Sequence, residues 1–191
     1  MKILVTGGSG FIGSHIVDVL VEQKHSVKNY DIESPKYDQK CAFIKADVMD
    51  FRRLLQETEH YDAIYHIAAE ANVNRFFESP FFSNYITSCA TLNVLEAART
   101  NSLFRILLAS TEWVYGSDPS NPDVLITEET PMTDNPDHIY TSSKIAAELF
   151  SKNYHKMYGV NYTIMRFGIP FGERGRPETV TPLFIRKIMN G

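Results

Sequence analysis

Short apolar runs alternate with longer amphipathic segments along nearly the whole chain. The short runs predict strands at 3–6, 27–31, 43–48, 62–69, 105–110 and 162–167. The longer segments repeat apolar residues at helical spacing and predict helices at 10–22, 81–99, 140–158 and 181–190. Asp50 is a suitable N-cap for a further short helix through Leu55. Residues 116–137 are rich in Pro, Asp, Ser and Thr and predict a long loop.

This repetition of strand and helix predicts an α/β fold with a doubly wound, parallel, Rossmann-like sheet. The run at 62–69 is apolar almost throughout, as expected for a parallel strand that is covered on both faces. No linker separates two regions of different composition. We therefore expect one domain over residues 1–191.

Composition narrows the class of protein. The chain has 19 Lys and Arg against 23 Asp and Glu, a net charge of −4, and no basic stripe, so we expect no nucleic-acid partner. No apolar stretch approaches the length of a membrane span, so we expect no membrane partner either. Cys41 and Cys89 have no metal-binding or disulfide spacing, which favours reduced thiols, a cytoplasmic location and no metal site.

A glycine-rich turn joins the first strand to the first helix. Gly8, Gly10 and Gly13 form G-x-G-x-x-G, and Gly7 adds a further glycine to the turn. Glycine allows a tight turn and lets a pyrophosphate approach bare backbone at a helix N-terminus. Asp31 ends the second strand 18 residues beyond Gly13, and a carboxylate there accepts hydrogen bonds from ribose hydroxyls. The pattern favours a dinucleotide site, and the acid favours NAD over NADP. The alternative is a glycine-rich turn that binds no ligand.

Tyr140 and Lys144 lie four residues apart in a predicted helix and so share one face. A nearby ammonium group stabilises a phenolate, so we expect Lys144 to lower the pKa of Tyr140 toward neutrality. Ser110 and Thr111 stand at the carboxyl end of the fifth strand, where ligands of open α/β sheets gather. The alternative is an ordinary surface helix face.

Together these motifs resemble the extended short-chain dehydrogenase/reductase family, in particular its nucleotide-sugar epimerases and dehydratases of the UDP-glucose 4-epimerase type. The resemblance rests on the glycine turn at 6–15, Asp31, 46–48, 66–69, 108–111 with 114–116, 140–144, and Arg166 with Gly172. It spans essentially the whole chain, but family members continue beyond the position of residue 191. The substrate-capping domain would then be missing after residue 191.

The resemblance implies roles for individual residues. Thr111, Tyr140 and Lys144 would be catalytic: Thr111 would bind the sugar hydroxyl, Tyr140 would take its proton, and Lys144 would tune Tyr140. The cofactor-binding residues would be Gly7, Gly10, Phe11, Ile12, Gly13, Asp31, Asp47, Val48, Ala68, Ala69, Tyr140 and Lys144. Transient oxidation at C4 of a UDP- or dTDP-hexose would then give an epimer. Relatives often form homodimers, here through the helices at 81–99 and 140–158.

Three positions depart from the family pattern. Thr87 and Ile169 stand where asparagines are usual, and Trp113 replaces the second acid of the dehydratases. Trp113 thus counts against a nucleotide-sugar 4,6-dehydratase, although it could either pack in the core or line a sugar pocket. The remaining alternative is an NAD-binding module without turnover. Intact Thr111, Tyr140 and Lys144 count against a fully degenerate module.

Overall fold

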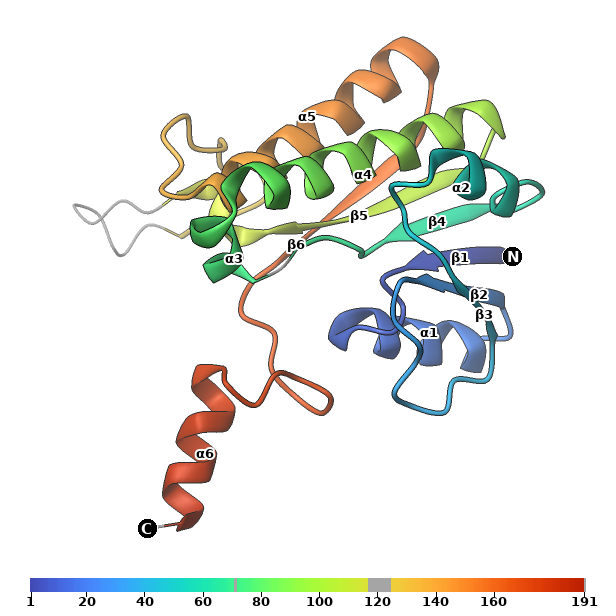
Figure 1. Ribbon diagram of the computed structural model, residues 1–191. Helices are drawn as coiled ribbons and strands as arrows, with labels where there is room; N and C mark the ends of the chain where they lie inside the picture. Colours follow the sequence, from blue (N-terminus) through green and yellow to red (C-terminus); the bar gives the residue numbers. More distant parts are fainter. Residues whose placement is uncertain (71, 117–124, 191) are drawn as a thin grey trace.

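The computed structural model describes residues 1–70, 72–116 and 125–190. Within them, six parallel strands form one sheet in the order β3-β2-β1-β4-β5-β6. The strands are β1 (Lys2–Thr6), β2 (Ser26–Asp31), β3 (Ala42–Lys45), β4 (Ala63–His66), β5 (Arg105–Thr111) and β6 (Tyr162–Phe167). This is the strand order of a dinucleotide-binding Rossmann fold, and it confirms the predicted doubly wound parallel sheet (Figure 1).

The helices also follow the predicted order. They are α1 (Phe11–Glu22), α2 (Phe51–Glu57), α3 (Val73–Glu78), α4 (Pro80–Thr100), α5 (Ile139–Tyr158) and α6 (Val180–Asn190), with a 3-10 helix, η1, at Glu112–Tyr115. The carboxylate of Asp50 accepts a hydrogen bond from the Arg53 backbone N–H, so the predicted cap of α2 is present. The sequence pattern did not predict α3 or η1, because both are too short to show a helical period.

Two predicted strands are too long. β3 ends at Lys45 rather than at 48, and β4 ends at His66 rather than at 69. Beyond β4 the Ala68 backbone N–H donates to the side-chain hydroxyl of Thr6 instead of to a neighbouring strand. An apolar run therefore continues past the last residue that pairs in the sheet.

The two faces of the sheet are covered by different helices. Helices α2, α4 and α5 lie over one face, with α4 and α5 side by side, and α1 lies over the other face (Figure 1). Side chains of β1 alternate between the two sides, so Leu4 joins the larger core cluster with α4 while Ile3 and Val5 join the smaller cluster with α1.

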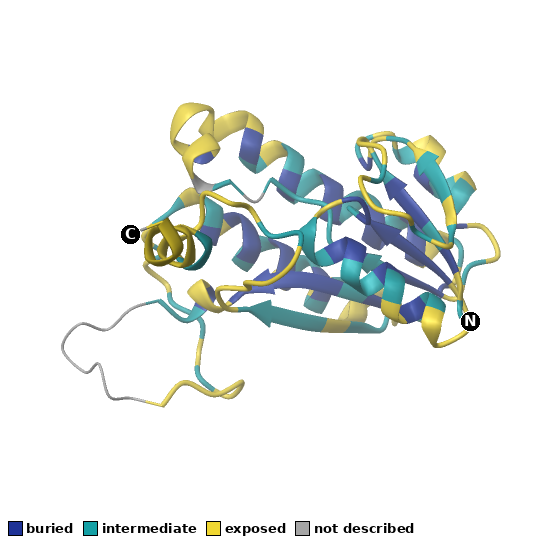
Figure 2. Cartoon of the chain, turned by 90° about the horizontal axis from the view of Figure 1, so that it is seen from below, coloured by how far each residue is buried: buried dark blue, intermediate teal, exposed yellow. Residues whose placement is uncertain are grey.

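Burial is concentrated in the strands and in the helix surfaces that meet them (Figure 2). Helix α6 has no buried residue among those described and projects away from the sheet (Figure 1). Its apolar side chains are largely exposed, Ile188 by 81% and Met189 by 80%. In the part of the chain that the structure describes, no helix has the length and apolar character needed to cross a membrane.

A buried ion pair ties α5 to β6. The fully buried Glu148 carboxylate accepts from Nε and Nη2 of Arg166 at 3.0 and 2.7 Å. The Ser110 hydroxyl donates to the same carboxylate at 2.6 Å, and Arg166 donates to the Tyr115 hydroxyl at 2.6 Å. These contacts join α5 to the carboxyl ends of β5 and β6.

We expect Glu148→Ala to lower the free energy of unfolding by about 3 kcal/mol, because it leaves the largely buried Arg166 guanidinium without its counter-charge. Denaturant titration measures the change. Asn153→Ala, at an exposed position of the same helix, is the control and should change stability by less than about 0.5 kcal/mol. Equal effects of the two substitutions would contradict a stabilising role for this pair.

Candidate functional site

The turn after β1 needs glycine for two steric reasons. Gly7 has φ +71, and a Cβ there would lie 2.7 Å from the backbone nitrogen of Ala68. A Cβ on Gly13 would lie 2.0 Å from the Gly7 carbonyl oxygen. A Cβ on Gly10 would meet only that oxygen, at 3.3 Å. Gly7 and Gly13 are thus required by packing, whereas exposed Gly10 leaves backbone open at the start of α1.

The N-terminus of α1 suits an anionic ligand. Gly10 caps the helix without a side-chain hydrogen bond, and the first turn carries no acidic residue. Backbone N–H groups at such a terminus bind phosphate oxygens, assisted by the helix dipole. Phe11 and Ile12 form this first turn with Gly13. The turn therefore has the open space and the electrostatic character that a pyrophosphate site needs.

Asp31 is held at the end of β2 beside the glycine turn. Its Oδ2 accepts from the Ser9 backbone N–H and its Oδ1 from the Glu33 backbone N–H, both at 2.9 Å. The Ser9 hydroxyl donates to the Glu33 carbonyl at 2.7 Å. The carboxylate thus has a defined orientation next to the expected pyrophosphate site, which suits a ribose.

Sequence reasoning missed the two residues that support this turn from below. Asn29 is fully buried, and its Nδ2 donates to the Ser9 hydroxyl at 3.1 Å and to Gln39 at 2.7 Å. Gln39 in turn donates to the Gly8 carbonyl at 2.7 Å. A polar residue at an inward position of β2 was the available signal for Asn29. Nothing in the local pattern indicated Gln39.

The remaining expected cofactor residues lie at the same carboxyl edge of the sheet. Asp47 and Val48 follow β3; the carbonyl of Asp47 accepts from the Tyr30 hydroxyl at 3.1 Å, and that of Val48 accepts from Asn93 at 2.9 Å. Ala68 and Ala69 follow β4 beside the glycine turn. The sheet topology thus brings four separate sequence segments to one edge.

His66 is a packing residue of this edge. It forms hydrogen bonds with the hydroxyls of Thr6, at 2.8 Å, and Thr91, at 3.4 Å. Burial, and to a lesser extent the charge of Lys144, lowers the pKa of His66 to about 3. His66 is therefore a neutral imidazole that joins β1, β4 and α4.

Thr111, Tyr140 and Lys144 come together where β5 meets the start of α5. Thr111 is buried at the end of β5, and its side chain lies close enough to the Tyr140 hydroxyl to act on the pKa of that phenol. Lys144 Nζ donates to the Ala109 carbonyl at 3.0 Å and lies 6.0 Å from the centroid of the Tyr140 ring. The three expected catalytic side chains are therefore neighbours.

The titration of this group differs from the sequence-based expectation. Burial raises the pKa of Tyr140, while its hydrogen bond with Thr111 acts in the opposite direction. Burial also lowers the pKa of Lys144 to about 8. Lys144 thus does not bring the Tyr140 phenol toward neutrality in the protein alone, because desolvation disfavours the charged form of both groups.

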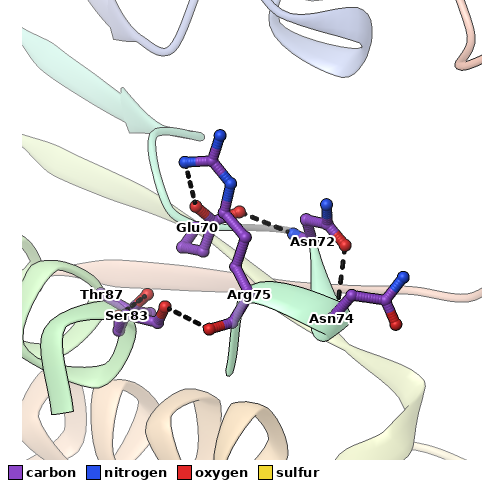
Figure 3. Close-up of polar contacts among 6 residues, drawn as sticks. All are labelled: Glu70, Asn72, Asn74, Arg75, Ser83 and Thr87. Carbon is purple, nitrogen blue, oxygen red and sulfur yellow. Dashed lines mark hydrogen bonds and ion pairs between the residues drawn. The ribbon is translucent and has the colours of Figure 1, made fainter. Parts of the chain in front are cut away.

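Polar contacts after β4 position α3 against α4 (Figure 3). The Glu70 carboxylate accepts from the Asn72 backbone N–H at 2.8 Å and pairs with Arg75 at 3.5 Å. The Ser83 hydroxyl donates to the Arg75 carbonyl at 3.2 Å. Thr87 donates to the Ser83 carbonyl at 3.0 Å, so the hydroxyl that replaces the family's usual asparagine is engaged within α4.

The other departures from the family pattern lie at the same end of the sheet. Trp113, in η1, is 38% exposed, and its ring centroid lies 5.9 Å from that of Tyr140. The tryptophan therefore lines the edge of the candidate site instead of packing wholly in the core. Ile169, after β6, is 74% exposed.

Comparison with known proteins adds a family to this geometry. The sequence model for the "NAD dependent epimerase/dehydratase family" matches residues 3–191. A "Putative UDP-glucose 4-epimerase" of Methanocaldococcus jannaschii is 35% identical over 98% of this chain and 63% of its own length. A human "dTDP-D-glucose 4,6-dehydratase" is 34% identical over 96% of this chain and 55% of its own length.

Solved structures agree with these relatives. A UDP-glucose 4-epimerase from Thermotoga maritima, with UDP-glucose, superposes with a TM-score of 0.88 at 26% identity, covering 100% of this chain and 63% of that one. A dTDP-glucose 4,6-dehydratase from Streptomyces venezuelae, with NAD bound, gives 0.87 at 30% identity, covering 100% and 62%. The chain spans about three fifths of the length of these proteins. The expected cofactor agrees with the NAD dependence of the family.

The buried lysine predicts a distinctive pH dependence of stability. Since the Lys144 pKa falls to about 8 on folding from 10.5, the unfolded chain binds more protons between these values, and stability should rise with pH across that window. Linkage gives a gain of about 2 kcal/mol from pH 8 to pH 10. Urea titrations of the native chain and of Lys144→Met measure it. The gain should be absent from the variant; parallel curves for the two proteins would contradict the burial of a charged Lys144.

Proposed function

The chain belongs to the NAD-dependent epimerase/dehydratase family, and on this premise we propose that residues 1–191 form the NAD-binding domain of a nucleotide-sugar 4-epimerase-like oxidoreductase. The observation that carries the proposal is the meeting of the glycine turn, Asp31 and the group of Thr111, Tyr140 and Lys144 at one edge of the sheet. The substrate-capping part would follow residue 191, since the matched relatives are longer than this chain.

The cofactor residues divide by the part of NAD that each would hold. The open backbone around Gly10, with Phe11 and Ile12 in the first turn of α1, suits the pyrophosphate, and Gly7 and Gly13 make that turn sterically feasible. The Asp31 carboxylate suits the adenosine ribose hydroxyls, where it would repel a 2′-phosphate. The adenine would lie by Asp47 and Val48. Ala68 and Ala69 would line the cleft.

Proton transfer would depend on the three neighbouring side chains. Thr111 would bind the C4 hydroxyl of the sugar, and Tyr140 would accept its proton. When bound, NAD supplies hydride transfer at that carbon. Lys144 would hold the nicotinamide ribose and, as a buried amine whose Nζ lies 6.0 Å from the ring centroid, stabilise the Tyr140 phenolate in its charged form. Because burial raises the pKa of Tyr140 in the protein alone, further positive charge in the occupied site would help it to act as a base.

The side chain at position 113 favours epimerisation over dehydration. Elimination of water needs a group that can protonate the leaving hydroxyl. Trp113 offers only an indole N–H, which does not act as an acid near neutral pH. Glu112 is exposed, and a Cβ on Gly168 would lie 2.8 Å from its Oε2, so this carboxylate is directed toward the end of β6. Position 113 therefore does not supply the second acid expected of a 4,6-dehydratase.

We also propose that α4 and α5 form a homodimer interface. The two helices pack against each other and expose large apolar side chains. Phe81 is 82% exposed and Phe82 58% exposed on α4, and Met157 is 66% exposed on α5. Large exposed apolar side chains on a packed helix pair are typical of an association site.

Asp31→Asn tests the cofactor assignment. We expect NAD to bind more tightly than NADP to the native chain, and the substitution to narrow that gap by weakening NAD binding about tenfold, since a charged acceptor is lost. Calorimetric titration with both dinucleotides measures the effect. Glu33→Gln is the control, because only the backbone of Glu33 contacts Asp31. A native preference for NADP would contradict the assignment.

Tyr140→Phe tests the proton acceptor. The reduction of NAD by UDP- or dTDP-glucose, followed by nicotinamide absorbance, should fall by about 10²–10⁴-fold in any form of the protein that turns over. NAD affinity should fall far less than the rate of reduction, because the ring is retained. Tyr154→Phe is the matched control on the same helix, since the Tyr154 hydroxyl only contacts Glu96. Near-native reduction by Tyr140→Phe would exclude this mechanism. Absence of reduction by the native chain, despite NAD binding, would favour the module without turnover.

A further inference from the structure

Five rings form a continuous row beside the candidate catalytic group. In order they are Phe76, Tyr140, Trp113, His138 and Phe77. Neighbouring centroids are 5.4, 5.9, 5.6 and 5.8 Å apart along the row. Three of the four contacts are edge-to-face, the arrangement that aromatic pairs favour. We call these five residues the aromatic row.

The row is not simply part of the core. Phe76 is 4% exposed and anchors one end, whereas Trp113 is 38% and Phe77 69% exposed. Between them, His138 is partly exposed at the N-cap of α5. A buried end and an accessible remainder make a wall whose rings can meet a ligand.

Trp113 also contacts the candidate catalytic residues directly. Its backbone N–H donates to the Thr111 hydroxyl oxygen at 3.3 Å, and its ring stands at 88° to that of Tyr140. A molecule that reaches both Thr111 and Tyr140 therefore comes within reach of the Trp113 indole. The Trp113 side chain has no part in the proposed transfer of the proton or the hydride.

We propose that Trp113 and His138 form an aromatic platform that holds the pyranose ring of the substrate against Thr111 and Tyr140; the substrate class rests on the proposed function. One face of a hexopyranose presents mainly C–H groups, which pack on aromatic faces through dispersion and weak polar attraction. The planes of the Trp113 and His138 rings are tilted at 56° to each other, so the pyranose would pack on the Trp113 face with His138 beside it. Such a contact also fixes the ring without a hydrogen bond to any one hydroxyl, so it tolerates either configuration at C4.

The platform also discriminates against sugars that carry a negative charge. Aromatic faces carry partial negative charge, so they attract C–H groups and disfavour a carboxylate. The platform residues Trp113 and His138 include no permanently charged cation that could compensate a buried carboxylate. Neutral hexoses are therefore favoured over hexuronates as the sugar part of the nucleotide sugar.

The chain supplies its own probe, because Trp113 is its single tryptophan. Tryptophan emission is followed while UDP-glucose, dTDP-glucose, UDP-glucuronate or UDP alone is added, with and without NADH. We expect a neutral nucleotide hexose to change the emission and UDP alone to leave it nearly unchanged. UDP-glucuronate should bind about tenfold more weakly than UDP-glucose.

Variants separate stacking from folding. By calorimetry, Trp113→Ala should weaken nucleotide-hexose binding about tenfold, and Trp113→Phe only about two- to threefold, because a ring remains. UDP affinity should not change in either variant. Phe104→Ala removes a ring that is 60% exposed next to the amino end of β5 and serves as the control.

The two proposals can fail separately. NADH binding is detected by energy transfer from Trp113 to the reduced nicotinamide. Absence of NADH binding would contradict the proposed function. The sugar titration without cofactor would still test the platform in that case. Native hexose affinity in Trp113→Ala, unchanged emission on hexose binding, a preference for UDP-glucuronate, or no response to any nucleotide hexose would each overturn the platform.

Discussion

The arrangement of the whole carboxyl edge depends on backbone packed against backbone at the glycine turn. A Cβ on Gly7 would lie 2.7 Å from the Ala68 nitrogen, and one on Gly13 would lie 2.0 Å from the Gly7 carbonyl oxygen. Only glycine lets β1, the segment after β4 and the start of α1 approach so closely. That approach also places the Thr6 hydroxyl where it meets both His66 and the Ala68 N–H.

Helix α5 is held to this edge by a stripe of polar side chains. Tyr140, Lys144 and Glu148 follow one another at intervals of four residues and so lie on one face of the helix. Lys144 donates to the Ala109 carbonyl and Glu148 accepts from Ser110, which sets the position of α5 along β5. The buried ion pair thereby supports the candidate site without belonging to it.

The two sides of the sheet differ in how completely they are covered. Helices α2, α4 and α5 enclose the larger core cluster, whereas among the described helices it is α1 that packs on the smaller one (Figure 1). The segment after β6 reaches α1 through an ion pair between Arg174 and Asp18 at 2.6 Å. Beyond it, α6 keeps its apolar side chains exposed. The face covered by α1 is thus less enclosed than the face covered by the other three helices.

The sequence by itself determined the order of the strands and of the helices other than α3 and η1, the glycine turn, the acid at the end of β2 and the shared face of Tyr140 and Lys144. These features follow from local periodicity and spacing, which can be recognised without knowing how the chain packs. Tertiary structure decided the rest. The support from Asn29 and Gln39 and the aromatic row join segments far apart in sequence, and no local pattern specifies such contacts. The raised pKa of Tyr140 likewise follows from burial, which exists only once α5 has packed on the sheet.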